Sequence, residues 1–416
     1  MFWLLIAPIV AGVLALAGAA FLAVDNYPRI AGKPQLTAAD IERAMRVLEQ
    51  HDPRKLKPST QQTITVSQQD LELALDYMAS RLGRGAVRVV LQDGAARIFA
   101  SAELPANPLG RYVNVEGRVT EAAGAVRIGG VRVGRVPVPD WLARWLVVEA
   151  LERAGATGAY KVTTSAVKRV SIADHRLSVT YEWRADLADE LRAAVIRPED
   201  QERLRAYQAA LAAAVGVGRP GSSATLAELI APLVRVAAER SMKGEAVAEN
   251  RAMILALTCY VNGKSLAALV PAAREWPRPQ HRSVTLRGRE DFAQHFTVSA
   301  TIASGAGRSV ADAVGLFKEV DDSRTGSGFS FQDLVADRAG TRFGELATSD
   351  QSSAKKLQAR VGARMRDSDM MPAPDDLPEG ITEADFKRRF DGLESPKYKR
   401  LMAEIDRRVA TTPLYR

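Results

Sequence analysis

The chain has 416 residues, of which 47% are hydrophobic and 25% charged, a balance that excludes an intrinsically disordered polypeptide. Lysine and arginine number 57 against 49 acidic residues, a net charge of +8, but the two signs alternate along most of the chain. No basic block or nucleic-acid motif is present, so binding to DNA or RNA is not expected. The single cysteine, Cys259, excludes an internal disulfide and a thiolate-rich metal site.

An uncharged apolar stretch occupies residues 2–24 and is long enough to cross a bilayer as a helix. No basic residue precedes it, although Ala17-Gly18-Ala19 is compatible with cleavage of a signal peptide. The sequence predicts a membrane anchor in residues 1–30 and a single-pass protein of the inner (cytoplasmic) membrane. Basic residues after the stretch favour a cytoplasmic chain, whereas the resemblances described below favour a periplasmic one, which is the expectation adopted.

The fold class predicted after this stretch is α+β, with an antiparallel β-rich domain in residues 31–215. Helices are expected near residues 36–52 and 67–82, each opened by a residue suited to cap a helix. Alternating apolar residues then predict a hairpin around Asp93-Gly94. The same alternation continues through residues 112–138 and 168–183, and it predicts one antiparallel sheet with an apolar face.

An amphipathic helix is expected to begin at Asp140. Its Trp141, Leu142, Trp145 and Leu146 either cover the apolar face of the sheet or lie on a membrane, and covering the sheet is the preferred interpretation because buried aromatic stripes are commoner than exposed ones. A curved sheet closed by helices next to an anchor resembles the tubular lipid-binding domains of bacterial envelope proteins. That resemblance implies a lipid or an envelope protein as the partner of this domain.

The second half of the chain is predicted to be mostly helical. Residues 216–226, which include GVGRPGSSAT, have the composition of a linker, and a helical domain is expected in residues 227–366. Residues 367–416 begin as a Pro- and Asp-rich linker and end in two amphipathic helices, which we expect to dock on the body of the protein or on a partner.

A histidine and several acidic residues converge in the predicted helical domain. Three helices are expected: one with His295 in its first turns, one ending near Asp322, and one capped by Ser330. Asp312, Glu319 and Asp322 fall on one stripe of the second helix, and Asp333 and Asp337 are four residues apart on the third. Two acidic stripes therefore flank one glycine-rich loop.

One imidazole with several carboxylates can hold a divalent metal ion or divide acid and base roles between them. The hypothetical catalytic residues are His295, Glu319, Asp322 and Asp333, and the hypothetical metal ligands are His295, Asp333 and Asp337. Gly326, Gly328, Ser330 and Arg324 are assigned a structural or anion-binding role at the start of the third helix. A solvated network of ion pairs and capping contacts is the alternative for the same residues.

The site residues occur in a pattern that resembles a known arrangement. D-x-x-x-H-F, an acidic helix ending E-x-x-D, and G-F-S-x-x-D-x-x-A-D-x-x-G are similar to YfiM-type predicted periplasmic lipoproteins and, more distantly, to the VanZ-like membrane family. The pattern covers about fifty residues and implies envelope association rather than a reaction. Those families commonly carry Lys and Asn where this chain has Phe292 and Asp337. The matching positions are Asp291, His295, Phe296, Glu319, Asp322, Gly328, Phe329, Ser330, Asp333, Ala336, Asp337 and Gly340.

Two functions follow as alternatives. The preferred one is a membrane-anchored envelope protein with a binding or structural role, holding lipid or a partner. The other is a membrane-associated hydrolase, either metal-dependent or acid/base, centred on His295 and the carboxylates of Glu319, Asp322, Asp333 and Asp337.

Overall fold

A computed structural model gives the fold of the chain. The structure describes residues 21–30, 36–50, 60–82, 85–122, 125–153, 157–184, 187, 190, 196–216, 222–243, 245–307, 311, 314–315, 318–319, 321–322, 328–362 and 364–416.

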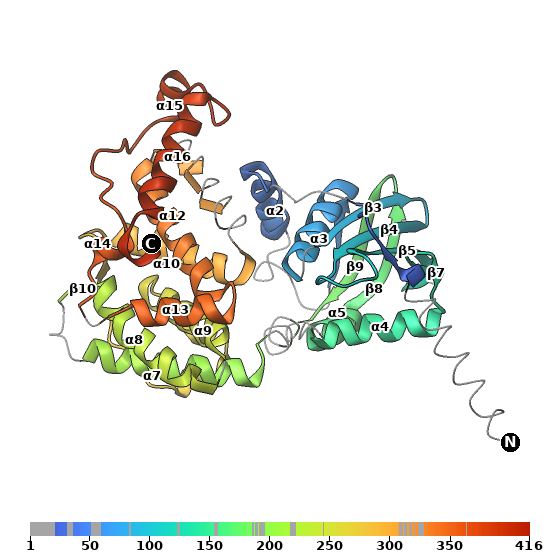
Figure 1. Ribbon diagram of the computed structural model, residues 1–416, viewed down its shortest axis with the longest axis horizontal. Helices are drawn as coiled ribbons and strands as arrows, with labels where there is room; N and C mark the ends of the chain where they lie inside the picture. Colours follow the sequence, from blue (N-terminus) through green and yellow to red (C-terminus); the bar gives the residue numbers. More distant parts are fainter. Residues whose placement is uncertain are drawn as a thin grey trace. The chain divides into compact units, whose positions relative to one another are not determined.

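The chain divides into two compact units, and the α+β class is confirmed (Figure 1). The first unit comprises residues 1–35 and 45–195, and the second comprises residues 36–44 and 196–416. The division after Val195 lies about twenty residues before the expected linker at 216–226, because the helix α7 (Pro198–Gly216) buries Tyr207 and Leu211 in the core of the second unit.

The predicted localisation is contradicted. Among the residues that the structure describes, no helix is long and apolar enough to cross a membrane. Most of the apolar stretch at residues 2–24 lies outside the described residues, and only its last residues are seen, ending in the short strand β1 (Val24–Asp25). We therefore correct the expectation of a single-pass inner-membrane protein.

The main sheet of the first unit is antiparallel. The predicted hairpin is confirmed: β3 and β4 pair around Asp93-Gly94, with Gln92 opposite Ala95. The strand order is β3-β4-β5-β6-β7, and β1 pairs with β5. The bounds are β3 (Gly85–Gln92), β4 (Ala95–Glu103), β5 (Tyr112–Ala122), β6 (Ala125–Val133) and β7 (Val136–Pro137).

A second antiparallel sheet replaces the single sheet expected from the sequence. Its order is β2-β9-β8, with β2 (Thr60–Ser67), β9 (Arg176–Trp183) and β8 (Val167–Ala173). The strand β2 was not predicted, because TQQTITVS carries few apolar residues. It pairs along its whole length with β9, and threonine side chains contact partners across the pair, as in Thr63 with Thr180 at 2.9 Å.

The helix α3 (Gln68–Leu82) lies along the edge strand β3 and occupies its outward backbone groups. The N–H of Val87 donates to Asp76 at 2.7 Å, that of Val89 to Glu72 at 3.1 Å, and that of Leu91 to Gln68 at 2.8 Å. Side chains four residues apart on the helix thus accept hydrogen bonds from N–H groups two residues apart on the strand, because both sets repeat along one side of their element.

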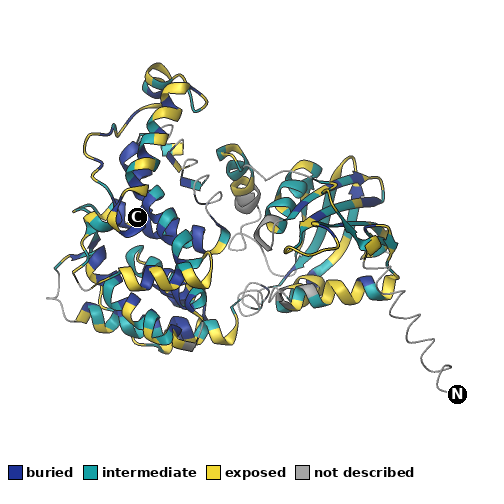
Figure 2. Cartoon of the chain, in the orientation of Figure 1, coloured by how far each residue is buried: buried dark blue, intermediate teal, exposed yellow. Residues whose placement is uncertain are grey.

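The helix α4 (Asp140–Arg153) forms as predicted and lies near β6, but its aromatic residues do not cover a sheet. Trp141 is 66% and Trp145 is 55% exposed, whereas Ala143 is buried. The side of the helix that carries Ala143 faces the protein, and the side that carries the tryptophans faces solvent (Figure 2). The preferred interpretation of the tryptophans as core residues is therefore wrong. The remaining described helices in or bordering this unit are α2 (Ala38–Gln50) and α5 (Thr157–Ala166).

The second unit is a helical domain around one large apolar core. A short parallel pair joins β10 (Ala224–Thr225) to β11 (Val284–Thr285). Its other helices, besides α7, are α8 (Leu226–Arg240), α9 (Ala246–Val261), α10 (Glu290–Ala306), α12 (Phe331–Thr348), α13 (Gln351–Arg360), α14 (Asp367–Met370), α15 (Glu383–Phe390) and α16 (Pro396–Ala410), with 3₁₀ turns η2 (Ser241–Lys243), η3 (Leu266–Ala268), η4 (Pro271–Glu275) and η5 (Pro413–Tyr415).

The backbones of helices α10 and α12 lie so close together that only glycine fits at two positions of their contact. A β-carbon at Gly340 would lie 2.0 Å from the carbonyl oxygen of Phe296, and one at Gly344 would lie 2.3 Å from that of Ala300. Glycines one turn apart therefore let the two backbones touch. This contact fixes the distance between the polar side chains that α10 and α12 carry toward their N-terminal ends.

The C-terminal helices dock on the second unit itself. Phe386 and Phe390 of α15 and Tyr398 of α16 pack against Phe331, with ring centroids 4.9 to 6.3 Å apart. The backbone of Phe329 pairs with Ile381 in an isolated bridge, which brings residues 379–380 beside the start of α12.

Candidate functional site

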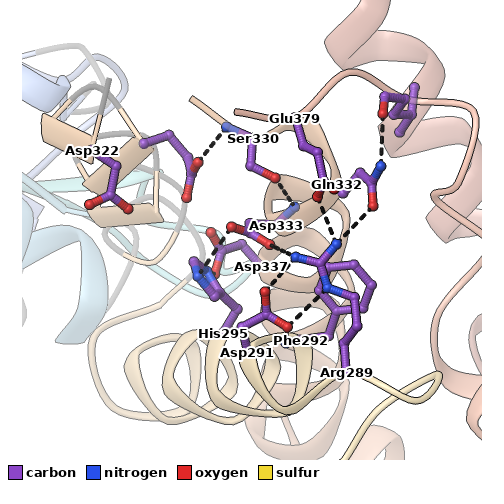
Figure 3. A network of polar contacts seen from close by, with 12 residues as sticks. Arg289, Asp291, Phe292, His295, Asp322, Ser330, Gln332, Asp333, Asp337 and Glu379 are labelled. Atoms are coloured by element: carbon purple, nitrogen blue, oxygen red, sulfur yellow. Dashed lines mark hydrogen bonds and ion pairs between the residues drawn. The ribbon is translucent and has the colours of Figure 1, made fainter. Parts of the chain in front are cut away.

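A cleft of about 670 Å³ opens in the helical unit beside the N-terminal half of α12. Its walls come from α10, from α12, from the helical residues around Lys318, and from Glu379-Gly380 of the C-terminal segment. Residues far apart in the chain therefore contribute side chains to one place, and Figure 3 shows the network of polar contacts around it.

His295 of α10 and Asp337 of α12 form a buried pair at the floor of the cleft. Nδ1 of the imidazole lies 3.1 Å from Oδ1 of Asp337 (Figure 3). The hydroxyl of Ser299 donates to the same oxygen at 2.7 Å. Ser299 is one turn after His295, so both contacts come from one face of α10. The close approach at Gly340, one turn after Asp337, brings this face into reach.

The other imidazole nitrogen, Nε2, lies between one positively charged and one negatively charged side chain. Nζ of Lys318 lies 3.1 Å away, and Oδ2 of Asp333 lies 3.7 Å away. A neutral imidazole can accept a hydrogen bond from Lys318, whereas an imidazolium faces Asp333. Burial lowers the pKa of His295, but the adjacent carboxylates, above all Asp337, outweigh it and raise the pKa to about 9.

Glu319 is the most deeply buried acid of the cluster, with 0% of the residue exposed. Its Oε2 accepts the backbone N–H of Ser330 at 2.8 Å, at the N-terminal end of α12. Among the described residues, no hydrogen-bond partner reaches its Oε1. Burial raises the pKa of Glu319 to about 8, although the N–H of Ser330 opposes this shift.

Three donor groups lie close enough to suggest a metal site. One atom each from His295, Glu319 and Asp337 lies within 4.8 Å of the others, and all three residues are buried. Ligands each about 2.1 Å from an ion can be at most about 4.2 Å apart, so a contraction of roughly half an ångström would complete the set. Oδ2 of Asp337 also has no hydrogen-bond partner among the described residues.

Space beside this free oxygen depends on a glycine. A β-carbon at Gly315 would lie 2.8 Å from Oδ2 of Asp337. The absence of a side chain at Gly315 therefore leaves room next to the unpaired oxygen, on the cleft side of the cluster.

Arg289 organises the acidic rim of the cleft. It donates to Asp291, at 3.1 Å through Nε, and to Glu379 at 2.7 Å and Gln332 at 3.1 Å, as Figure 3 shows. Its guanidinium lies 3.8 Å from Asp333. These carboxylates raise the pKa of Arg289 further, so it stays charged, and burial raises the pKa of Asp333.

The predicted site residues are partly brought together. His295, Asp333 and Asp337 line the cleft, and Glu319, buried beside them, rather than Asp333 completes the close donor group. Asp322 lies at the wall of the cleft and pairs with Lys318 at 2.7 Å. Arg324, Gly326 and Asp312 lie outside the described residues.

Gly328 and Ser330 have structural roles that the sequence indicated only in part. Gly328 has φ +85° and a β-carbon there would lie 2.4 Å from the backbone of Gly380, so it permits the approach of the C-terminal segment. Ser330 caps α12 by accepting the N–H of Asp333 at 3.0 Å. The anion at this helix N-terminus is the protein's own Glu319 carboxylate.

The sequence did not indicate Arg289, Ser299 or Glu379 as site residues. Ser299 had a usable signal, because it follows His295 by four residues on the same helix. Arg289 and Glu379 had none, since they meet only after the C-terminal segment folds against α12.

Comparison of the chain with models of protein families, with curated proteins and with solved structures found no match. The resemblances to YfiM-type lipoproteins, to the VanZ-like family and to tubular lipid-binding domains thus stay predictions. The function has to be argued from the cleft.

Proposed function

We propose that the helical unit is a divalent-metal-dependent hydrolase whose ion is held by His295, Glu319 and Asp337. The observation that carries the proposal is that Glu319 and Asp337, two acids of one three-residue donor group, each have a buried carboxylate oxygen without a hydrogen-bond partner among the described residues, Oε1 and Oδ2 respectively. A buried, unpartnered carboxylate oxygen is costly, and a cation removes that cost.

The donor set suits a borderline-hard ion such as Zn²⁺ or Mn²⁺, because it offers one imidazole and two carboxylates. Such an ion supplies a hydroxide from bound water near neutral pH and polarises the bond to be cleaved. Ser299, which donates to Asp337, and Ser330, which donates to Glu319, would hold the two carboxylates in orientation.

Neighbouring residues can handle protons and charge. Asp333, with its pKa raised by burial and its Oδ2 near Nε2 of His295, is placed to take a proton at the cleft. Lys318 can donate one, or stabilise negative charge that develops on the substrate.

The charge of the cleft restricts the substrate. Its described lining contains the carboxylates of Asp291, Asp322, Asp333, Asp337 and Glu379, and Glu319 beside it adds a sixth. The permanent cations Arg289 and Lys318 and a bound divalent ion offset four of these charges, which leaves 6 − 2 − 2 = 2 negative charges. A polyanionic substrate would be repelled, so we propose a neutral or cationic ester or amide. Binding of lipid or a partner by the first unit stays a separate prediction.

Metal analysis tests the proposal. Purified full-length protein should bind Zn²⁺ or Mn²⁺ at one equivalent in calorimetry, and should cleave members of a panel of nitrophenyl esters and anilides only when loaded. His295→Ala should abolish both properties, whereas His281→Ala, which removes an exposed imidazole elsewhere in the unit, should change neither. Failure of the wild-type protein to bind either ion would refute the proposal.

A further inference from the structure

A second cavity, of about 500 Å³, lies in the helical unit and has no described lining residue in common with the cleft. It is bounded by α7, by the end of α9, by η3 and by η4. Its volume falls in the range of about 300–1,000 Å³ that is usual for small-molecule sites. Nothing in the proposed hydrolase mechanism uses it.

The floor of this cavity is apolar. Leu211 of α7, Ala256 of α9, Leu266 of η3 and Ala273 of η4 line it and are all buried. Cys259 lies among them half-buried, and burial raises the pKa of its thiol. The thiol is therefore uncharged at neutral pH and behaves as one more small apolar group.

The rim of the cavity carries positive charge only. Lys264, Arg274, Arg278 and His281 line it and are exposed, and the described lining residues include no aspartate or glutamate. Arg278 donates to the backbone oxygen of Arg274 at 3.2 Å, and among the described residues neither arginine has an ion pair. This contrasts with the first cleft, where Arg289 and Lys318 both pair with carboxylates.

We propose that this cavity binds an amphipathic anion, with an aliphatic or aromatic body on the apolar floor and a carboxylate or phosphate head between Lys264, Arg274 and Arg278. Three cations that have no ion pair with any described residue favour an anionic head, and guanidinium groups bind carboxylate and phosphate through paired N–H donors. The buried floor favours an apolar body, because its transfer from water is favourable in proportion to the area buried.

Calorimetry with three probes of the full chain tests the head and the body separately. Decanoate should bind, decyltrimethylammonium should bind at least tenfold more weakly because it carries the same tail and the opposite charge, and acetate should not bind because it lacks the tail. Equal binding of the two long probes would overturn the proposal, as would tight binding of acetate. Decyl phosphate in place of decanoate distinguishes the two head groups.

Variants locate the site. Arg274→Gln combined with Arg278→Gln should weaken decanoate binding at least tenfold, whereas Arg205→Gln, an exposed arginine on α7, should leave it unchanged. Both altered arginines are exposed, so folding should be kept, and circular dichroism with thermal unfolding checks this. Unchanged decanoate affinity in the folded double variant would overturn the proposal.

The thiol gives an independent readout. Bound decanoate should slow the reaction of Cys259 with a maleimide severalfold, because Cys259 lines the same cavity. Decanoate that binds without protecting Cys259 would occupy another place and would also overturn the proposal. The His295→Ala variant should bind decanoate as the wild type does, so failure here and failure of the proposed hydrolase site can be told apart.

Discussion

Two glutamates are buried in the helical unit to a similar extent, Glu249 at 4% and Glu319 at 0% exposed, yet their surroundings differ. Glu249 accepts from Arg203 at 3.3 Å, from the hydroxyl of Tyr207 at 2.7 Å and from Arg240 at 2.8 Å, so donors occupy both of its oxygens. Glu319 accepts one backbone N–H, and its second oxygen has no hydrogen-bond partner among the described residues.

The difference distinguishes Glu249, whose hydrogen bonds stabilise the fold, from Glu319, which the surrounding fold keeps buried with one carboxylate oxygen lacking a donor. A buried charge is tolerated when donors and counter-charges surround it, and this is the case for Glu249. Glu319 instead is buried next to His295 and Asp337, which line the cleft, and its Oε1 has no hydrogen-bond partner among the described residues. Burial depth alone would rank the two residues together, and only the completeness of their contacts distinguishes them.

The largest expected effect is a loss of stability when the hydrogen bonds of Glu249 are removed. Glu249→Ala leaves Arg240 without this partner and leaves the buried Tyr207 hydroxyl without its acceptor, so we expect a loss of about 3–5 kcal/mol in the free energy of unfolding. Urea denaturation measures it. A loss of less than about 1 kcal/mol in the free energy of unfolding would show that Glu249 contributes little to stability, and would remove the contrast with Glu319.

Variants of the cluster formed by His295, Glu319 and Asp337 should instead lose more metal affinity than stability. Asp337→Asn keeps the shape of the side chain but removes its charge, so metal affinity should fall tenfold to a hundredfold. The free energy of unfolding should fall by about 1–2 kcal/mol, less than in Glu249→Ala, because the imidazolium of His295 loses its carboxylate partner. Calorimetry with Zn²⁺ and urea denaturation measure the two quantities. Asp376→Asn, at an exposed carboxylate that pairs with Arg408, is the matched control. A large loss of stability with no change in metal affinity would assign Asp337 to the fold.

A smaller effect concerns the cation already beside the cluster. Nζ of Lys318 lies 3.1 Å from Nε2 of His295 and 3.8 Å from Oε1 of Glu319, where it opposes a second cation. Because its side chain is half exposed, solvent weakens this repulsion, and Lys318→Met should raise metal affinity about tenfold. Lys355→Met, an exposed lysine on α13, should leave the affinity unchanged. An unchanged or lower affinity in Lys318→Met would mean that Lys318 does not compete for the site.

A separate effect is a pH dependence of the stability of the metal-free protein. The folded-state pKa of Glu319 is about 8 against the usual 4.5, so between these values the folded chain holds a proton that the unfolded chain has lost. The free energy of unfolding should therefore fall as pH rises from about 4.5 to 8. His295, with a pKa of about 9 against 6.5, adds a fall of the same sign between those two values.

Glu319→Gln should flatten the part of this slope below pH 6.5, where His295 does not contribute, and leave the part above pH 8. Urea denaturation at pH 5, 6.5 and 8.5 with a chelator present measures both parts. Identical slopes in the variant and the wild type would show that Glu319 does not titrate in this range.

Much of the helical unit could be predicted from the sequence, because caps and 3.6-residue periods are local. Ser330 caps the helix that it was expected to open, and the two C-terminal helices expected from the sequence begin after the caps Thr382 and Ser395. The β-rich unit was predicted less well. Alternation indicated β3 to β6, β8 and β9, but it could not assign β8 and β9 to a separate sheet, and β2 escaped because threonine and glutamine stand where apolar residues were sought.

The candidate site could be located but not assembled from the sequence. The spacing of Asp333 and Asp337 placed both on one helix face, and His295 was singled out with them. Nothing local could show that Gly340 and Gly344 bring α10 and α12 into backbone contact, or that the donor group within 4.8 Å would contain Glu319 rather than Asp333. These outcomes depend on tertiary packing.

The contact between α3 and β3 has a consequence for how the first unit meets other chains. An edge strand normally presents free N–H groups that can recruit a strand from a neighbouring molecule, the first step toward intermolecular sheets. Here Gln68, Glu72 and Asp76 already occupy three of those groups on β3. Self-association by strand addition along this border therefore first requires α3 to detach, and truncations that shorten α3 should promote aggregation.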